Sequence, residues 1–141
     1  MKVKLGKDFA WEMAHRLPFH EGPCKNIHGH SYKMRVELIG DLDKNGMVLD
    51  FYDIHRIVQP YIEKLDHAFL CNEKDEKVIT FLKENDFKLY IIPNNTTSEY
   101  MAIYLASEFA TEFKKFKNLD VMHVRVYETA DAFAEVSIVL K

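Results

Sequence analysis

Residues 3–15, with the sequence VKLGKDFAWEMAH, alternate between apolar and polar side chains. Residues 28–38, with the sequence HGHSYKMRVEL, alternate in the same way. A period of two is typical of a β-strand that buries one face, and Lys7 is the one break in the first run. The sequence therefore predicts two long strands. If they pair antiparallel, the end of the first lies beside the beginning of the second.

The rest of the chain changes to a helical period and then back to alternation. Apolar residues recur at helical spacing over 54–65, after Asp50, and predict a helix that Pro60 could kink. Thr96 and Glu99 form a capping box that predicts the start of a longer helix. The further elements expected are a short helix over 74–84, a strand over 88–92, the long helix over 97–116, and strands over 121–128 and 133–140. This order predicts an α+β fold, an antiparallel sheet with helices on one face.

Length and composition indicate one domain with its own core. Of the 141 residues, 48% are hydrophobic, and no repeat or linker divides the chain, so residues 1–141 are expected to form a single domain. A net charge of -3 offers no excess of positive charge to a nucleic acid or an anionic membrane, and neither is an expected partner. No apolar run could span a bilayer, and residues 1–8 lack the apolar stretch of a secretion signal. We therefore expect a cytoplasmic protein in which Cys24 and Cys71 are free thiols.

Three histidines occupy the facing ends of the two predicted strands. His15 ends the first strand, while His28 and His30 begin the second and project to one side because they are two residues apart. Neutral imidazole is the commonest metal ligand in proteins, and three histidines leave the fourth tetrahedral position open, as catalytic zinc sites do. An open position would polarise a substrate oxygen or acidify a bound water. The pattern predicts a catalytic Zn²⁺ site, with iron as the alternative metal.

A simpler interpretation makes His28 and His30 turn residues and His15 a cap on an apolar face. Three imidazoles at one end of that face would each need a hydrogen-bond partner, so we favour the metal. Cys24 lies four residues before His28, in a connection over 16–27 that is longer than a hairpin needs. A thiol this close to a dication ionises readily. Cys24 could serve as a base, as a nucleophile, or as a fourth ligand that closes the site.

Other acidic residues are weaker candidates. Asp66 and His67 follow the first predicted helix, and such a pair can fix a tautomer for proton transfer, although a solvated helix end explains it equally well. Glu99 has a structural explanation in the capping box, and Glu128 has one at the rim of a strand. Composition and spacing alone give these residues no assigned role.

Six short motifs occur in order along nearly the whole chain. They are His15 after Met-Ala, Cys-x-x-x-His-Gly-His-Ser-Tyr over 24–32, Met-Val-Leu-Asp-Phe over 47–51, Leu-Asp-His over 65–67, Thr-Ser-Glu over 97–99, and Tyr-Glu-Thr over 127–129. Together they resemble the family of 6-pyruvoyl-tetrahydropterin synthases and 6-carboxytetrahydropterin synthases. The resemblance implies a tunnelling fold, in which subunits join four-stranded antiparallel sheets into a barrel with the helices outside.

The resemblance also implies a role for each candidate residue. By position, the matches are the zinc ligands His15, His28 and His30, the catalytic Cys24, the proton-transfer pair Asp66 and His67, and the pterin-binding carboxylates Glu99 and Glu128. A carboxylate suits the pterin because the ring's N3–H and 2-amino group form a planar pair of donors. In such proteins the site lies between subunits. A homo-oligomer is therefore implied, a hexamer built as a dimer of trimers, with inactive single subunits.

The substrate implied by the resemblance is a small pterin, 7,8-dihydroneopterin triphosphate. Loss of its side chain as acetaldehyde, with release of triphosphate, would give 6-carboxy-5,6,7,8-tetrahydropterin for queuosine and other deazapurines. Triphosphate elimination with internal redox would give 6-pyruvoyltetrahydropterin instead. The compact length and the Cys-x-x-x-His-Gly-His spacing look more like the 6-carboxy branch. A zinc hydrolase for another small molecule and a non-catalytic zinc or pterin-binding protein are the remaining alternatives.

Two segments depart from the family's usual pattern. Where the family usually has Asn-Pro-Thr-Ser-Glu, this chain has Pro-Asn-Asn-Thr-Thr-Ser-Glu over 93–99. After the Asp-His pair, the chain is one residue longer and has Leu-Cys-Asn over 70–72. Both segments border the expected pterin pocket, so a shifted substrate preference is a further alternative.

Overall fold

The computed structural model describes all 141 residues. Its elements, in chain order, are β1 (Val3–His15), the 3-10 turn η1 (Pro23–Lys25), β2 (His28–Gly40), α1 (Phe51–Leu65), β3 (Ala68–Asn72), α2 (Glu76–Glu84), β4 (Leu89–Ile92), α3 (Ser98–Phe113), β5 (Leu119–Thr129) and β6 (Ala132–Val139). The fold is α+β, and the two long N-terminal strands form as their alternation predicts.

All strands belong to one sheet with the order β4-β3-β1-β2-β5-β6. Strands β1, β2, β5 and β6 pair antiparallel, as expected. The expectation of a four-stranded antiparallel sheet is nevertheless wrong, because β3 and β4 add parallel strands at the free edge of β1 and make the sheet six-stranded and mixed. Strand β3 is a short apolar run whose first four residues are all buried. Such a run has no alternation to reveal it, and the sequence alone did not predict it.

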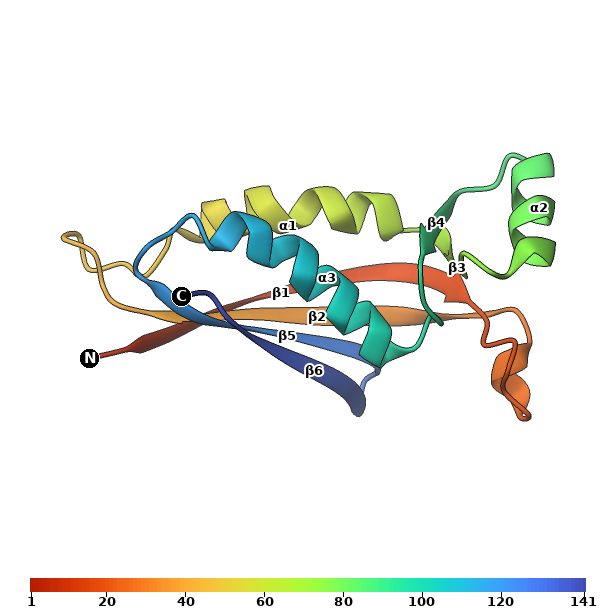
Figure 1. Cartoon of the computed structure of the whole chain (residues 1–141), viewed down its shortest axis with the longest axis horizontal. Helices are drawn as coiled ribbons and strands as arrows, with labels where there is room; N and C mark the ends of the chain where they lie inside the picture. The colour runs from red at the N-terminus through yellow and green to blue at the C-terminus, as the bar shows by residue number, and fades with distance from the viewer.

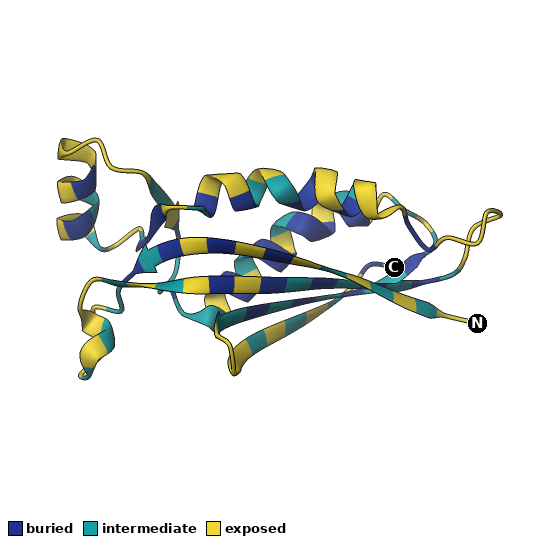
Figure 2. Cartoon of the chain, turned by 180° about the vertical axis from the view of Figure 1, so that it is seen from behind, coloured by how far each residue is buried: buried dark blue, intermediate teal, exposed yellow.

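Helices α1 and α3 cover one face of the sheet (Figure 1). Figure 2 shows β1 and β2 as alternating buried and exposed bands, because every second side chain enters the core beneath these helices. Helix α1 continues through Pro60, which lies on its exposed side. The opposite face of the sheet carries ion pairs between neighbouring strands, such as Arg35 with Asp8 at 2.8 Å. The covered face is therefore the one on which an apolar site can form.

The start of α3 differs from the prediction. Thr97, rather than Thr96, is the N-cap, and its side-chain oxygen accepts a hydrogen bond from the backbone N–H of Tyr100 at 3.2 Å. The predicted capping box between Thr96 and Glu99 is wrong, because Thr96 is buried and its polar atoms point to the end of β1. Because Thr97 caps the helix, the carbonyl and hydroxyl of Thr96 can form hydrogen bonds with His15 and Arg16 instead.

Helix α2 lies beyond the end of the sheet and packs on β3 through a small apolar cluster (Figure 1). Cys71 belongs to this cluster, and burial raises the pKa of its thiol to about 11. Arg16, the residue after β1, forms two hydrogen bonds with Asp75 at 2.8 and 2.9 Å, which fasten the start of α2 to the end of β1. No helix in the chain is both long and apolar enough to cross a membrane.

Candidate metal centre and active site

The register of β1 and β2 brings the three predicted histidines together. His15 lies directly opposite His28, and His30 is two residues further along β2 on the same face. The ring centroids are 4.6 Å apart for His15 and His28, 5.2 Å for His15 and His30, and 4.9 Å for His28 and His30. One nitrogen from each ring lies within 4.8 Å of the other two. The predicted convergence of these side chains is confirmed.

Backbone carbonyls orient two of the three rings. The Nδ1–H of His15 donates to the carbonyl oxygen of Thr96 at 2.9 Å, and the Nδ1–H of His28 donates to that of Asn26 at 2.8 Å. A proton on Nδ1 leaves the lone pair on Nε2, which is the usual way in which a second hydrogen bond prepares a histidine ligand. Both Nε2 atoms are therefore available to a cation.

The Nε2 atoms of all three histidines are buried and have no hydrogen-bond partner. Buried polar atoms are nearly always paired, so three unpaired nitrogens at one point need an explanation. Burial lowers the pKa of His15 to about 4 and also lowers the pKa of His30, which keeps these rings neutral near pH 7. A neutral, three-nitrogen donor set fits Zn²⁺ or another divalent transition metal. It does not fit the simpler interpretation of these residues as turn histidines.

Two further side chains on the same face adjoin the three histidines. Glu128, from β5, places Oε1 at 3.4 Å from Nε2 of His15 and 3.6 Å from Nε2 of His30. Tyr32, the next inward residue of β2 after His30, has its ring centroid 5.5 Å from that of His30. Its buried hydroxyl has no partner. Sequence reasoning did not single out Tyr32, although the alternation of residues 28, 30 and 32 placed it on this face.

Asp66 and His67 form the expected pair just after α1. Oδ1 of Asp66 lies 3.0 Å from Nδ1 of His67 and accepts the backbone N–H of Glu12 at 2.9 Å. These two contacts, that to Glu12 first, lower the pKa of Asp66. His67 has a φ of 60°, a strained value for a residue with a side chain, and its N–H donates to the carbonyl oxygen of Glu12. The pair is thus fastened to β1.

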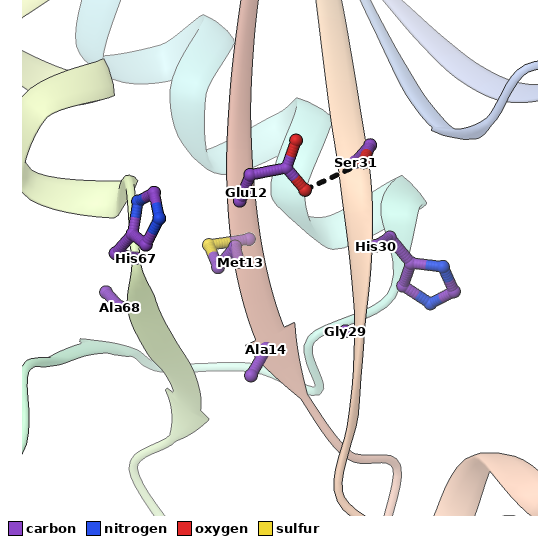
Figure 3. Close-up of a pocket in the computed structure, with 8 residues that line it drawn as sticks. All are labelled: Glu12, Met13, Ala14, Gly29, His30, Ser31, His67 and Ala68. Carbon is purple, nitrogen blue, oxygen red and sulfur yellow. Dashed lines mark hydrogen bonds between the residues drawn. The ribbon is translucent and has the colours of Figure 1, made fainter.

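Within one chain this pair does not join the three histidines. His67 and His30 line opposite sides of a pocket of about 370 Å³, but His67 is not among the grouped ligand atoms. Glu12 and Ser31, which also line it, are hydrogen-bonded to each other on the exposed face of the sheet. Figure 3 shows His67 and His30 on either side of β1 and β2, with the ring of His30 directed away from His67. The side chain of His67 is 76% exposed. Its imidazole is therefore open to another molecule.

The side chains of Cys24 and Glu99 form no hydrogen bond with the three histidines. Cys24 is half-buried in η1, and its carbonyl oxygen accepts the N–H of Leu17 at 2.8 Å. Its sulfur is not among the donor atoms that gather within 4.8 Å, so nothing supports Cys24 as a fourth metal ligand. Glu99 is exposed in the first turn of α3. The roles of both residues stay predictions.

The two segments that depart from the family's pattern contact each other. The side-chain amide of Asn72 donates to Oδ1 of Asn95 at 2.9 Å. The next residue, Thr96, holds His15 through its carbonyl and donates its hydroxyl to the carbonyl of Arg16 at 3.2 Å. These supporting residues were missed, and no periodicity could have found them, since backbone carbonyls carry no sequence signal. One of the altered segments therefore supplies the carbonyl that accepts from His15, and the other contacts Asn95, the residue before Thr96.

Comparison with known proteins identifies the family of this chain. The chain matches the family model described as 6-pyruvoyl tetrahydropterin synthase over residues 4–138 and belongs to this family. A relative from Haemophilus influenzae, described as 6-carboxy-5,6,7,8-tetrahydropterin synthase, is 37% identical over 140 residues, which cover 94% of this chain and 96% of that protein. A relative from Rickettsia felis with the same description is 28% identical over 137 residues, 95% of this chain and 99% of that one. The predicted family is confirmed.

Solved structures extend the comparison to the fold. The crystal structure of 6-pyruvoyl tetrahydropterin synthase from Plasmodium vivax superposes with a TM-score of 0.77 at 20% sequence identity, and 99% of each chain is covered. That of a Caenorhabditis elegans protein with the same description gives a TM-score of 0.70 at 23% identity. These matches confirm the α+β tunnelling fold of the single chain. The barrel of subunits stays a prediction.

Proposed function

We propose that this protein is a zinc-dependent 6-carboxy-5,6,7,8-tetrahydropterin synthase, which converts 7,8-dihydroneopterin triphosphate and releases acetaldehyde and triphosphate. The observation that carries the proposal is the group of three unpaired Nε2 atoms at the end of an apolar sheet face. The descriptions of the Haemophilus influenzae and Rickettsia felis relatives support the 6-carboxy branch. A role in making queuosine or other deazapurines, in the cytoplasm, is part of the proposal.

His15, His28 and His30 would hold the zinc ion, since their ligand atoms already lie together. When bound, zinc supplies a Lewis acid that makes protons on the substrate's hydroxyl-bearing side chain easier to remove. The apolar face around the histidines excludes water and strengthens electrostatic interactions there. Glu128, 31% exposed and next to these histidines, would accept hydrogen bonds from the pterin ring, and Glu99 would contribute a second carboxylate.

Proton transfer in the proposal uses two separate groups. Cys24 as thiolate takes a proton from the substrate's side chain, and His67 returns a proton elsewhere. Asp66 accepts from Nδ1 of His67, which fixes the ring and leaves Nε2 free to exchange a proton with the substrate. Cys24 is half-buried, so its thiol is not closed off from a substrate.

Separation of His67 from the three histidines supports a site shared between copies of the chain. The ring of His67 faces outward on the opposite side of β1, so a second subunit could receive it. We therefore propose a homo-oligomer, a hexamer built as a dimer of trimers. In this assembly, one subunit contributes the metal ligands and its neighbour contributes Asp66 and His67.

The proposal is tested by incubating the zinc-reconstituted protein with 7,8-dihydroneopterin triphosphate and following acetaldehyde, triphosphate and the pterin product together. Acetaldehyde released in step with the pterin supports the 6-carboxy branch. Triphosphate without acetaldehyde would instead assign the 6-pyruvoyl reaction, which the description of the family model favours. Lack of any consumption by a zinc-containing oligomer would contradict both reactions and leave a non-catalytic binding protein.

The two free cysteines allow a matched comparison in this assay. We expect Cys24→Ala to keep zinc and to lose turnover by about 10²–10⁴-fold, the usual contribution of a positioned acid or base. Cys71→Ala, in the small apolar cluster beside α2, should keep both zinc and turnover. Loss of zinc from Cys24→Ala would make Cys24 a ligand and remove it as the base.

A further inference from the structure

Tyr32 has the only buried phenol beside the three histidines, and its hydroxyl lacks a hydrogen-bond partner. Its residue is 1% exposed, so water does not reach this group from outside. A buried hydroxyl without a hydrogen-bond partner destabilises the folded chain, whereas phenylalanine would fill the same space without this cost. The missing acceptor must come from the contents of the site or from a side chain that moves.

The sheet register identifies the side chain that can meet this hydroxyl. The pairing of β2 with β5 ends at Lys33 and Tyr127, and the residues just beyond this pair are Tyr32 and Glu128. Both lie beside the histidines, Tyr32 by its ring and Glu128 by its carboxylate. Glu128 accepts no hydrogen bond from any protein donor, and its carboxylate lies beside the rings of His15 and His30. Trp11 stacks on the Tyr32 ring at 5.6 Å with an interplanar angle of 10°, which holds the phenol in place. The donor is held in place, and the acceptor is on a flexible, partly exposed side chain.

Glu128 also lies where it could obstruct the metal. Oε1 is 3.4 and 3.6 Å from the two ligand nitrogens of His15 and His30. Carboxylates are good zinc ligands, and a fourth protein ligand turns an open catalytic site into a closed structural one. Something must keep this carboxylate from completing the coordination.

We propose that the Tyr32 hydroxyl donates a hydrogen bond to the Glu128 carboxylate in the metal-bound protein and holds it off the metal, so that the fourth position stays open to the substrate. Tyr32 is then a positioning residue that acts through Glu128. The proposal rests on the metal site of the proposed function but not on the identity of the substrate. It explains a buried hydroxyl, an unpaired carboxylate and an incomplete ligand set with one contact.

The test compares zinc affinity among Tyr32→Phe, Glu128→Gln, the double variant and wild type, by competition with a metal chelator. We expect Tyr32→Phe to bind zinc about tenfold more tightly, because Glu128 released from one charge-assisted hydrogen bond becomes a ligand. Glu128→Gln should bind zinc like wild type, and adding Tyr32→Phe to it should change nothing. Tyr61→Phe is the matched control, since it removes a phenol that donates to Glu108 at 3.0 Å, away from the site. It should also bind zinc like wild type.

Cobalt substitution gives a second readout. The visible spectrum of the Co²⁺ protein should change in Tyr32→Phe and return to that of wild type in the double variant. A merely structural role for Tyr32 predicts weaker metal binding or none of these changes. Unchanged or weaker zinc affinity in Tyr32→Phe would overturn the proposal, and so would the same gain in the Glu128→Gln background. If wild type binds zinc but consumes no dihydroneopterin triphosphate, the proposed function fails while the four affinities still decide the role of Tyr32.

Discussion

The two histidine-containing regions of this protein are built in opposite ways. His15, His28 and His30 project from paired strands, have buried Nε2 atoms, and have two of their rings fixed by backbone carbonyls. His67 follows a helix in a strained backbone conformation, and its side chain is 76% exposed. Strand pairing brings the first region together, whereas the second is a pair formed by two consecutive residues, Asp66 and His67. This difference is what the proposed function requires, in which the first region holds a cation and the second supplies a group to a neighbouring subunit.

The largest expected effect tests whether the three strand histidines bind metal. His30→Ala removes one of three nitrogen ligands, and we expect at least 100-fold weaker zinc binding, since even loss of a supporting hydrogen bond to a ligand costs about 10–100-fold. Turnover should disappear with the metal. Metal content per chain, measured by plasma mass spectrometry after exhaustive dialysis, checks the expectation.

His123→Ala is the control for this variant. His123 also projects from a strand, but its Nδ1 lies 2.7 Å from the hydroxyl of Ser137 on the next strand, outside the metal group. It should retain zinc. Equal zinc in His30→Ala and wild type would show that the unpaired nitrogens are not a metal site.

The second prediction concerns the exposed pair. His67→Ala and Asp66→Asn should keep full zinc content, because neither side chain reaches the three histidines, and should lose turnover by about 10²–10⁴-fold. Mixed oligomers made by refolding His67→Ala with His30→Ala should regain part of the wild-type turnover, because some interfaces then combine two intact contributions. His55→Ala, an exposed histidine on α1, serves as the control. Failure of the mixed oligomers to regain turnover would place the two regions in one subunit's site or in no common site.

The group of three histidines could be predicted from sequence because it depends on the alternation of side chains along each strand. Alternation in residues 3–15 and 28–38 sets the faces of two neighbouring strands, and antiparallel pairing then forces His15 beside His28. The α+β class followed from the same periodicities. Neither conclusion needed a contact between distant parts of the chain other than this one pairing.

The features that the sequence did not predict depend on tertiary contacts. Strand β3 is a short apolar run whose parallel pairing with β1 involves only two residue pairs, Met13 with Ala68 and Ala14 with Phe69. Thr96 was read as a helix cap, yet tertiary packing turns it toward His15. Tyr32 was part of a predicted strand face, but only its unpaired hydroxyl reveals a role beyond packing. Periodicity identifies which face a residue occupies, and the partner on that face has to come from the three-dimensional structure.

The smallest expected effect is on stability, and it concerns the ion pair that joins the end of β1 to the start of α2. Asp75 pairs with Arg16, the residue after His15, and this guanidinium lowers the pKa of Asp75 from its usual 3.8. Because the pKa is lower in the folded chain, the pair's contribution is complete above the usual value and is lost as the pH falls through the lower folded value. We expect Asp75→Asn to reduce the free energy of unfolding by about 1 kcal/mol at pH 7, a typical value for a partly exposed pair.

Urea unfolding of wild type and Asp75→Asn, measured from pH 7 down to pH 3, checks this expectation. The difference between the two proteins should be constant down to about pH 5 and shrink below pH 4, because protonated Asp75 no longer attracts Arg16. Comparing the two proteins at each pH removes the effect of acid on the histidines, which both share. A difference that stays the same at pH 3 would mean that Asp75 stabilises the start of α2 by its shape and hydrogen bonds alone, and that its charge does not fasten α2 to the strand that ends in His15.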